Sequence, residues 1–328
     1  MELVVGVAGA TGALGKELIE LLDGASWRPA ELRPLASPAS KVPFVDYGEH
    51  QIAVDNLDDQ VVGELDALFL VTPPGIAAGV GATAVHEGVV TIDLSGALGG
   101  DLPLVDPVLL PRSMEDAMQR GGAVLPGAPA LALSRVLGAL KRELSITGWD
   151  AVVNLPASHW GRDGLEELSN QVIALFNQGT PTRKKFPTGL AFDLIPQVGE
   201  AEEDGHSSEE LAVLGQVRAL SGVGGGDVTL VGVPVFSGMS GVIRVQVKGS
   251  PALEQVRGLL AAGQLHLPPS GRARHIPHPR SVDGREDLSV GRVRVSEGEI
   301  HLWFALDNLR VMAALAVGVC GMLVRGER

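Results

Sequence analysis

The stretch "LVVGVAGATGALGKELIELL", residues 3–22, decides the fold of the first part of the chain. Residues 3–8 are continuously apolar and rich in β-branched side chains, which is typical of a parallel strand buried on both faces. A glycine-rich turn follows, and residues 18–22 then supply the apolar face of a helix. The stretch therefore predicts a strand, a tight turn and a helix.

The turn "GATGALG" has three glycines with separable roles. Gly9 permits the tight turn, Gly12 lets backbone N–H groups approach a pyrophosphate, and Gly15 allows the helix to pack closely on the strand. An anion would then sit at the N-terminus of the helix. The alternative is that the glycines only make the turn, and the residues leave both interpretations open.

Further strands alternate with a helix over the first 128 residues, which predicts a Rossmann-like parallel sheet with helices on both faces. The expected strands are Leu32–Ala36, Ala67–Val71, Val89–Leu94 and Gly121–Gly127, and the helix runs from Ile76 to Glu87.

The pattern changes over residues 129–306, where long alternating strands and helices predict an α+β domain. Ser207 and Glu210 form the Ser-x-x-Glu of a capping box, so a helix should begin there. A hairpin should turn at Glu297-Gly298, and residues 265–287 should form a loop. The other expected elements are helices over 131–144 and 165–176, and strands over 149–157, 227–236 and 240–248.

The amino-acid composition disfavours several classes of function. The net charge is −13 and the isoelectric point about 5.1, which disfavours binding to nucleic acids and to anionic membranes. The single cysteine excludes an internal disulfide and fits the cytoplasm. The N-terminal residues have no basic n-region followed by a cleavage site, so no secretory leader is expected. The apolar run from Val311 to Val324 is too short to span a bilayer and predicts a buried helix.

Several segments together resemble the aspartate-semialdehyde dehydrogenase family over essentially the full length of the chain. The motifs are "GATGALG" at 9–15, "LAS" at 35–37, "AFDLIPQVGE" at 191–200, "VGVPVFSG" at 231–238, "VGRVR" at 290–294 and "DNLR" at 307–310. "IDLSGAL" at 92–98 is similar to the Usg-1-like paralogues of this amino-acid biosynthesis enzyme.

The resemblance implies an NADP-binding domain, a dimerisation domain and a last helix, residues 307–328, that packs back on the first domain. It also implies a reaction in which a cysteine thiolate attacks the substrate, a hydride passes to or from nicotinamide, and a histidine carries the proton. Arginines of the family hold the substrate's carboxylate and phosphate.

The residues that the family needs for this chemistry are not found at their positions. Pro129 aligns with the family's proline, but the cysteine position falls on Ala130 or Leu131, and the histidine position on Met239. None of these side chains supplies a nucleophile or carries a proton at neutral pH. Cys320 lies in an apolar helical run and is expected to be a core residue. Ser134 has no evident base.

The substrate clamps have also changed. The two arginine positions fall on Gly99 and Gly232, and the glutamine position falls near Leu155. The family's helical Glu and Lys positions fall on Gln216 and Ala219, while Arg218 between them remains. The position of the arginine that binds the cofactor's 2′-phosphate falls on Ala39; Ser37, Ser40 and Lys41 remain beside it.

The resemblance and the turn together predict a site for NADP or NAD, and they do not decide between these two or show that either still binds. The expected cofactor-binding residues are Gly9, Thr11, Gly12, Ala13, Leu14, Gly15, Ser37, Ser40, Thr72 and Pro73. A remodelled pocket for a small ligand would use Ser95, His159, Arg162 and Arg218.

Other chemistries find little support. The only tyrosine, Tyr47, has Gln51 four residues on, so a Tyr-x-x-x-Lys reductase is excluded. His275 and His278 would need a third ligand, such as Asp283 or His301, to bind zinc, and two loop histidines are favoured, so we expect no metal site. The basic run 182–186 is expected to be a solvated loop.

The sequence therefore favours a cytoplasmic homodimer without dehydrogenase activity that serves as a scaffold for nucleotide, ligand or protein binding. An NAD(P)-dependent semialdehyde oxidoreductase with an altered active site is the alternative. A third hypothesis is a hetero-oligomer with an active paralogue.

Overall fold

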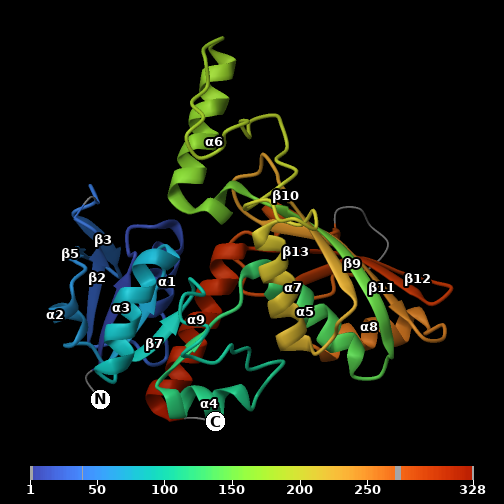
Figure 1. Ribbon diagram of the computed structural model, residues 1–328, viewed down its shortest axis with the longest axis horizontal. Coiled ribbons are helices and arrows are strands. Elements are labelled where there is room, and N and C mark those ends of the chain that lie inside the picture. The colour runs from blue at the N-terminus through green and yellow to red at the C-terminus, as the bar shows by residue number, and fades with distance from the viewer. Residues whose placement is uncertain (1–2, 39, 270–274, 327–328) are drawn as a thin grey trace. The chain divides into compact units, whose positions relative to one another are not determined.

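The structure is a computed structural model that describes residues 3–38, 40–269 and 275–326 (Figure 1). The chain divides into two compact units. The first comprises the segment up to Gly127 together with the segment from Met312, and the second comprises Ala128–Val311. The mixed α/β class and the parallel N-terminal sheet predicted from the sequence are confirmed.

The first unit is built on six parallel strands in the order β5-β2-β1-β6-β7-β8. Because β2 and β6 flank β1 on opposite sides, the chain order reverses next to β1, which is where doubly wound sheets bind their ligands. The strands are β1 (Val4–Ala8), β2 (Glu31–Ala36), β5 (Asp55–Asn56), β6 (Ala67–Leu70), β7 (Val90–Asp93) and β8 (Gly122–Val124).

Apolar side chains form the core of this unit. All residues of β6 are buried, and Leu18, Ile19 and Leu22 of α1 are buried as well. The sequence missed an antiparallel hairpin formed by β3 (Phe44–Tyr47) and β4 (His50–Ala53). The helices of this unit are α1 (Ala13–Asp23), α2 (Asp59–Val62), α3 (Pro74–His86) and α4 (Ser113–Arg120).

Helix α9 (Asn308–Arg325) passes from the second unit into the first. Trp27 Nε1–H donates to Val317 O at 3.2 Å, and a Cβ on Gly321 would lie 2.3 Å from that nitrogen. The helix has 18 residues and is long and apolar enough to cross a membrane, with 44% of its span buried inside the protein. The prediction that the apolar run from Val311 to Val324 is too short to span a bilayer therefore does not hold for the whole helix, which is longer than that run. Its contact with the Trp27 ring fits the predicted core helix.

The second unit contains a five-stranded mixed sheet in the order β10-β9-β11-β13-β12. Only β9 and β10 are parallel; the other neighbours are antiparallel. The hairpin turns at Glu297-Gly298 as predicted. The strands are β9 (Ile146–Leu155), β10 (Gly226–Gly232), β11 (Met239–Val247), β12 (Ser289–Ser296) and β13 (Glu299–Leu306).

Helices α5 (Ala128–Lys141), α7 (Ser208–Ser221) and α8 (Leu253–Ala262) pack on one face of this sheet (Figure 1). Val152 and Val242 lie exposed on β9 and β11. Helix α6 (Gly161–Phe176) projects from the sheet (Figure 1). The predicted loop over 265–287 contains a short 3₁₀ turn, η3 (Pro279–Ser281), and part of it lies outside the described residues.

Candidate functional site

The glycine turn lies between β1 and α1 with the geometry that its sequence predicts. Gly9 has φ +96°, and a Cβ there would lie 2.8 Å from Val71 O. A Cβ on Gly15 would lie 2.3 Å from Gly9 O, so both positions require glycine. Gly12 has an ordinary extended conformation and a Cβ would lie 3.2 Å from Gly9 O. Its predicted role, backbone approach to a phosphate, stays a prediction.

The N-terminus of α1 is suited to an anion. Gly12 is the N-cap, no side chain caps this end, and no acidic residue lies in the first turn. The N–H groups of Ala13, Leu14 and Gly15 are therefore at the positions where a helix has no intrahelical acceptors. The positive end of the helix dipole adds to their attraction for a phosphate.

Two neighbouring strand ends complete this edge of the sheet. After β2, Ser40 Oγ–H donates to Thr11 Oγ1 at 3.2 Å, and Ser40 N–H donates to Ser37 O at 2.9 Å. After β6, the hydroxyl of Thr72 is buried and has no hydrogen-bond partner in the described chain, and Pro73 is the N-cap of α3. An unpaired buried hydroxyl at the carboxyl edge of the sheet is a group that a ligand would satisfy. We call the site formed by the glycine turn, the N-terminus of α1 and these two strand ends the cradle.

The cradle fits the diphosphate of a dinucleotide better than it fits either ribose. Ser37, Ser40 and the exposed Lys41 follow β2, so no carboxylate is found there to bind a ribose 2′-hydroxyl. The predicted 2′-phosphate position, Ala39, lies outside the described residues. The residues therefore do not discriminate NADP from NAD.

Ser95, predicted to belong to a remodelled pocket, takes part in a local turn of the first unit. Its hydroxyl donates to Asp93 Oδ1 at 2.5 Å, and its N–H donates to the same oxygen at 2.7 Å. The other oxygen of Asp93 accepts the Leu98 N–H at 2.8 Å. The fully buried Asp93 thus organises residues 93–98, and Ser95 helps to hold that turn.

His159, also predicted for that pocket, lies in the 3₁₀ turn η1 (Ala157–Trp160) after β9. Its Nε2 lies 3.0 Å from Glu209 Oε2, and its ring meets the Trp160 ring edge-on at 5.0 Å. The hydrogen bond from His159 lowers the pKa of Glu209; desolvation opposes this shift and the charge of Lys185 adds to it. The sequence did not single out Glu209, since the contact joins residues 50 positions apart.

The other two predicted pocket residues lie elsewhere. Arg162 Nε lies 3.4 Å from Glu166 Oε1, one turn along α6. Arg218 is near the C-terminal end of α7, nine residues beyond Glu209, which is about 13 Å along a helix axis. The structure therefore does not bring Arg218 to His159.

Two family models match this chain: "Semialdehyde dehydrogenase, NAD binding domain" over residues 4–117, and "Semialdehyde dehydrogenase, dimerisation domain" over residues 151–311. The chain belongs to the semialdehyde dehydrogenase family. The resemblance inferred from the motifs is confirmed, and the dimerisation domain supports a homodimer.

Relatives named as USG-1 homologs and relatives named as aspartate-semialdehyde dehydrogenases both align with nearly the whole chain. The USG-1 protein homolog of Pseudomonas aeruginosa is 29% identical over 98% of this chain and 97% of its own. The aspartate-semialdehyde dehydrogenase of Rickettsia bellii is 28% identical over 95% and 94%. The crystal structure of aspartate semialdehyde dehydrogenase II of Vibrio cholerae, complexed with ASA, has a TM-score of 0.92 at 25% identity, covering 99% of each chain.

Apolar side chains fill the positions where the family resemblance places the cysteine and the histidine. Ala130 and Leu131 lie in the first turns of α5 and are 0% and 1% exposed. Met239, the first residue of β11, is 1% exposed. The hydroxyl of Ser134 is buried and has no hydrogen-bond partner among the described residues, so no base contacts it.

Cys320, the single cysteine of this semialdehyde dehydrogenase family member, is fully buried in α9. Burial raises the pKa of its thiol far above neutral pH. Because the thiolate is the reactive form, Cys320 is inert in the folded chain.

The two arginine positions of the family differ in the space around them. A Cβ on Gly99 would have no atom nearer than 3.6 Å. A Cβ on Gly232 would lie 2.9 Å from the Trp160 ring and 3.0 Å from Ile195 Cβ. The side chains of Trp160 and Ile195 therefore occupy the space that an arginine at position 232 would need.

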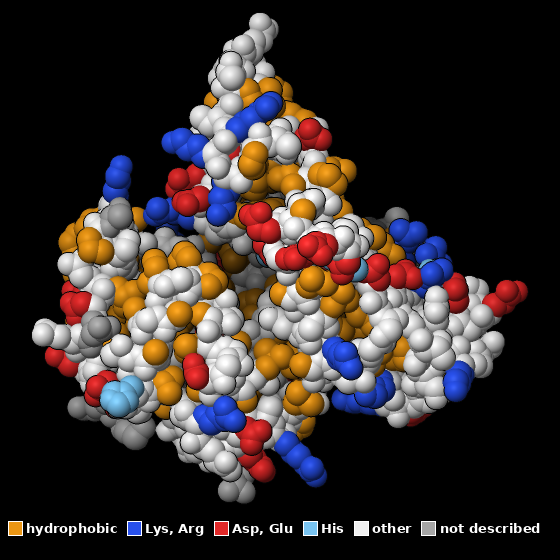
Figure 2. Space-filling view, in the orientation of Figure 1, with side chains coloured by type: hydrophobic (Ala, Val, Ile, Leu, Met, Phe, Trp, Pro, Cys, Tyr) orange, Lys and Arg blue, Asp and Glu red, His pale blue; other side chains and the backbone are white. Residues whose placement is uncertain are grey.

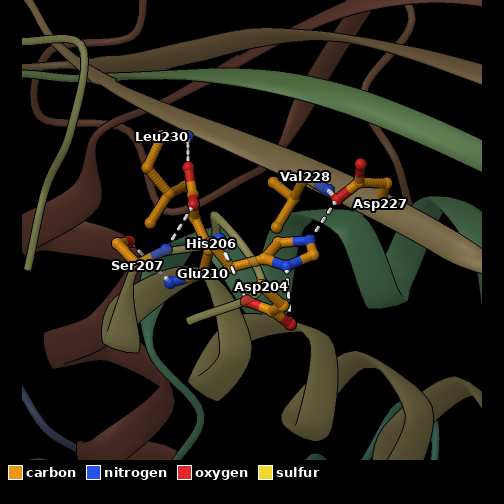
Figure 3. A network of polar contacts seen from close by, with 7 residues as sticks. All are labelled: Asp204, His206, Ser207, Glu210, Asp227, Val228 and Leu230. Atoms are coloured by element: carbon orange, nitrogen blue, oxygen red, sulfur yellow. Dashed lines mark hydrogen bonds and ion pairs between the residues drawn. The ribbon is translucent and has the colours of Figure 1, made fainter. Parts of the chain in front are cut away.

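A second histidine network, which the sequence did not reveal, joins the loop before α7 to strand β10 (Figure 3). His206 Nε2 lies 3.0 Å from Asp227 Oδ1, and Nδ1 lies 3.1 Å from Asp204 Oδ2. Beside it, Glu210 accepts the N–H groups of Ser207 and Leu230, each at 2.8 Å, and completes the predicted capping box. Together these contacts fix the start of α7 on the sheet.

The histidines that raised the question of a metal are not gathered into a metal site. Within the described ranges, no three His, Cys, Asp or Glu side chains are placed to hold a metal ion. His275 Nδ1 is buried without a partner in that part of the chain, and the N–H of His278 donates to Ser281 Oγ at 2.8 Å.

Proposed function

We propose that this chain is a member of the semialdehyde dehydrogenase family that lacks dehydrogenase activity and serves as a dimeric, dinucleotide-binding scaffold. The observation that carries the proposal is the burial of Ala130, Leu131 and Met239 at the family's cysteine and histidine positions. A thiolate nucleophile and a proton carrier must both reach the substrate in the family's reaction. Buried alkyl and thioether groups supply neither.

Cys320 does not replace the missing nucleophile. Its thiol is buried, and its raised pKa keeps it protonated at neutral pH. Ser134 is equally buried and has no contacting base in the described chain. An unactivated hydroxyl is a weak nucleophile.

An activity assay tests this proposal. Pure protein is incubated with aspartate semialdehyde, phosphate and NADP, and NADPH is followed by its absorbance, with the Rickettsia bellii enzyme as a positive control. We expect no NADPH from this chain. NADPH formation that survives the Cys320→Ala substitution would refute the proposal.

We also propose that the cradle still binds NADP or NAD. The uncapped N-terminus of α1, the glycine turn and the unpaired hydroxyl of Thr72 support it. When bound, the cofactor supplies a hydride-accepting nicotinamide, and the chain's part is to hold its diphosphate. Isothermal titration with NAD, NADP and ADP tests the binding, and Thr72→Val should weaken it. Absence of heat with all three nucleotides removes the proposal.

An enzyme with altered chemistry is the second candidate. The specific observation in its favour is the His159–Glu209 pair, because a histidine oriented by a carboxylate is suited to proton transfer. Screening NAD- and NADP-dependent oxidation of semialdehydes other than aspartate semialdehyde would reveal it. Turnover that His159→Gln abolishes supports this candidate over the scaffold.

A mixed oligomer with an active paralogue is a third candidate, and it rests on the family's dimerisation domain. We place the protein in the cytoplasm, with neither a membrane nor a nucleic acid as partner. Native mass spectrometry after co-expression with an aspartate-semialdehyde dehydrogenase from the source cell separates homodimers from mixed dimers. A population of homodimers alone excludes the mixed assembly.

A further inference from the structure

A cavity of about 630 Å³ lies in the second unit, at the amino ends of β9 and β10 and the C-terminal end of α7. This is the opposite end of these strands from His159. Its walls are Trp149, Leu214, Gly215, Arg218 and residues 222–226. The volume is in the range that proteins use for small molecules.

Glycine residues form much of the wall of this cavity. Gly215, Gly222 and the run Gly224–Gly226 contribute backbone instead of side chains to its walls. A Cβ on Gly226 would lie 1.9 Å from Cε2 of the Trp149 ring, so the ring lies there only because residue 226 is glycine. Any larger residue at 226 would displace the indole.

Two hydrogen-bond donors in the walls have no acceptor among the described residues. The residue Trp149 is 4% exposed, and its buried indole Nε1–H has no hydrogen-bond partner within the described ranges. Arg218 is exposed, and no ion pair or hydrogen bond to its guanidinium is found in the part of the chain that the structure describes. A buried N–H without an acceptor costs free energy unless a bound molecule supplies one.

The charge around the cavity favours an anion. None of the nine wall residues carries a carboxylate, in a chain whose net charge is −13. The carbonyl groups of Ser221 and Gly222, at the negative end of α7, each accept a hydrogen bond from Lys141 Nζ at 3.0 Å. Lys141 thus offsets the helix end that would otherwise repel an anion.

We propose that this cavity binds a small organic anion with an apolar body. A carboxylate or phosphate pairs with the Arg218 guanidinium and accepts the Trp149 Nε1–H, and the apolar body lies against Leu214 and Val223. The cavity lies in a different unit from the cradle and shares no residue with it.

The indole N–H reports directly on binding. The chain has four tryptophans, so protein labelled with ¹⁵N-tryptophan gives up to four indole signals, and Trp149→Phe identifies the one that matters. Benzoate and phenyl phosphate are the anionic probes; benzamide and benzamidine are the neutral and cationic controls. We expect a saturable shift of the Trp149 signal with at least one anionic probe and none with the controls. The anion that binds with the lower dissociation constant shows whether the cavity prefers a carboxylate or a phosphate.

Two substitutions test the residues. Arg218→Gln should weaken the anion at least tenfold, whereas Arg183→Gln, an exposed arginine outside the cavity, should not. Gly215→Leu should fill the cavity and abolish the shift without unfolding the protein. A Cβ at 215 meets no atom within 4 Å, and leucine is a better helix former than glycine. Absence of a Trp149 shift at millimolar probe, or a shift that neither substitution changes, overturns the proposal.

Discussion

The Trp160 ring occupies the space beside Gly232, where a Cβ would lie 2.9 Å from the indole. Trp160 also packs edge-on against Phe186 at 5.0 Å between ring centroids, so it is fixed from two sides. At the position where the family resemblance places a substrate-binding arginine, this chain has built a packed apolar contact. The packing around Gly232 therefore leaves no space for a longer side chain unless Trp160 or Ile195 moves.

Restoring that arginine should damage the fold. Gly232→Arg forces its side chain against Trp160 and Ile195, and overpacking of this kind costs about 1–3 kcal/mol of unfolding free energy. Gly99→Arg, at the family's other arginine position, is the control, because a Cβ there meets nothing nearer than 3.6 Å. Urea denaturation measures both. Equal stability of the two variants would show that Trp160 moves aside at little cost.

The glycine turn gives a second test. Gly15→Ala places a methyl group 2.3 Å from Gly9 O, a backbone atom that cannot rotate away. We expect a loss of about 2 kcal/mol or more. Gly79→Ala in α3 meets no atom within 4 Å and should stabilise the protein by up to about 1 kcal/mol. Thermal unfolding separates them, and a Gly15→Ala variant as stable as the parent would contradict the described packing.

Features that depend on residues close together in the sequence were predictable, and features that depend on distant residues were not. The β1–turn–α1 unit was predictable because its signals, a run of buried apolar residues and fixed glycine spacing, lie within 20 residues. The β3–β4 hairpin was missed because only Val45 and Tyr47 on β3 are buried, which is too few for a clear alternation. The contact between His159 and Glu209 could not be predicted, because the two residues are 50 positions apart and meet only in the folded chain.

The same distinction applies to the family's chemistry. The motifs allowed positions 130, 131 and 239 to be assigned to the family's cysteine and histidine positions. The structure adds that the side chains there are buried. The packing of Trp160 against Gly232 could not be read, because it depends on two loops that follow different strands. These loops pair through Ala157 N–H to Val235 O at 2.7 Å, a contact with no local sequence signal.

The His206 network should make the loop before α7 sensitive to pH. The hydrogen bonds that the His206 ring donates to the carboxylates of Asp227 and Asp204 raise its pKa above the ordinary 6.5. A raised folded-state pKa contributes stability that is fully present below pH 6.5 and is lost as pH rises through the folded value. The pKa of Asp204 is lowered by the backbone and side chain of His206, so its contribution is lost at low pH, as pH falls through that lowered value.

Amide hydrogen exchange measures this effect. The Glu202 N–H, which donates to His206 O, should show its greatest protection below pH 6.5 and lose it above, after correction for intrinsic exchange. His206→Gln should remove the pH dependence, while His86→Gln, an exposed histidine in the first unit, should leave it intact. The same pH profile in both variants would assign the effect to another group.

A buried carboxylate holds the basic loop that follows α6. Glu167 is 7% exposed, and its two oxygens accept the N–H groups of Lys184, Lys185 and Phe186 at 2.7–3.0 Å. The loop side chains Arg183, Lys184 and Lys185 remain exposed; basic side chains are visible near the base of the α6 projection in Figure 2. The carboxylate therefore fixes the backbone of a segment that is rich in trypsin sites.

Removing this carboxylate should release the loop. Glu167→Ala leaves three backbone donors without their acceptor, at a cost on the order of 3 kcal/mol. We expect trypsin to cut the variant rapidly after residues 183–185 under native conditions, with the cut sites read by mass spectrometry. Glu166→Ala is the matched control, since the side chain of that neighbouring glutamate is 63% exposed and pairs with Arg162 on its own helix. Equal cleavage rates in the two variants would show that the loop is held by its remaining contacts, such as those of Gln171 with Leu190 and Ala191.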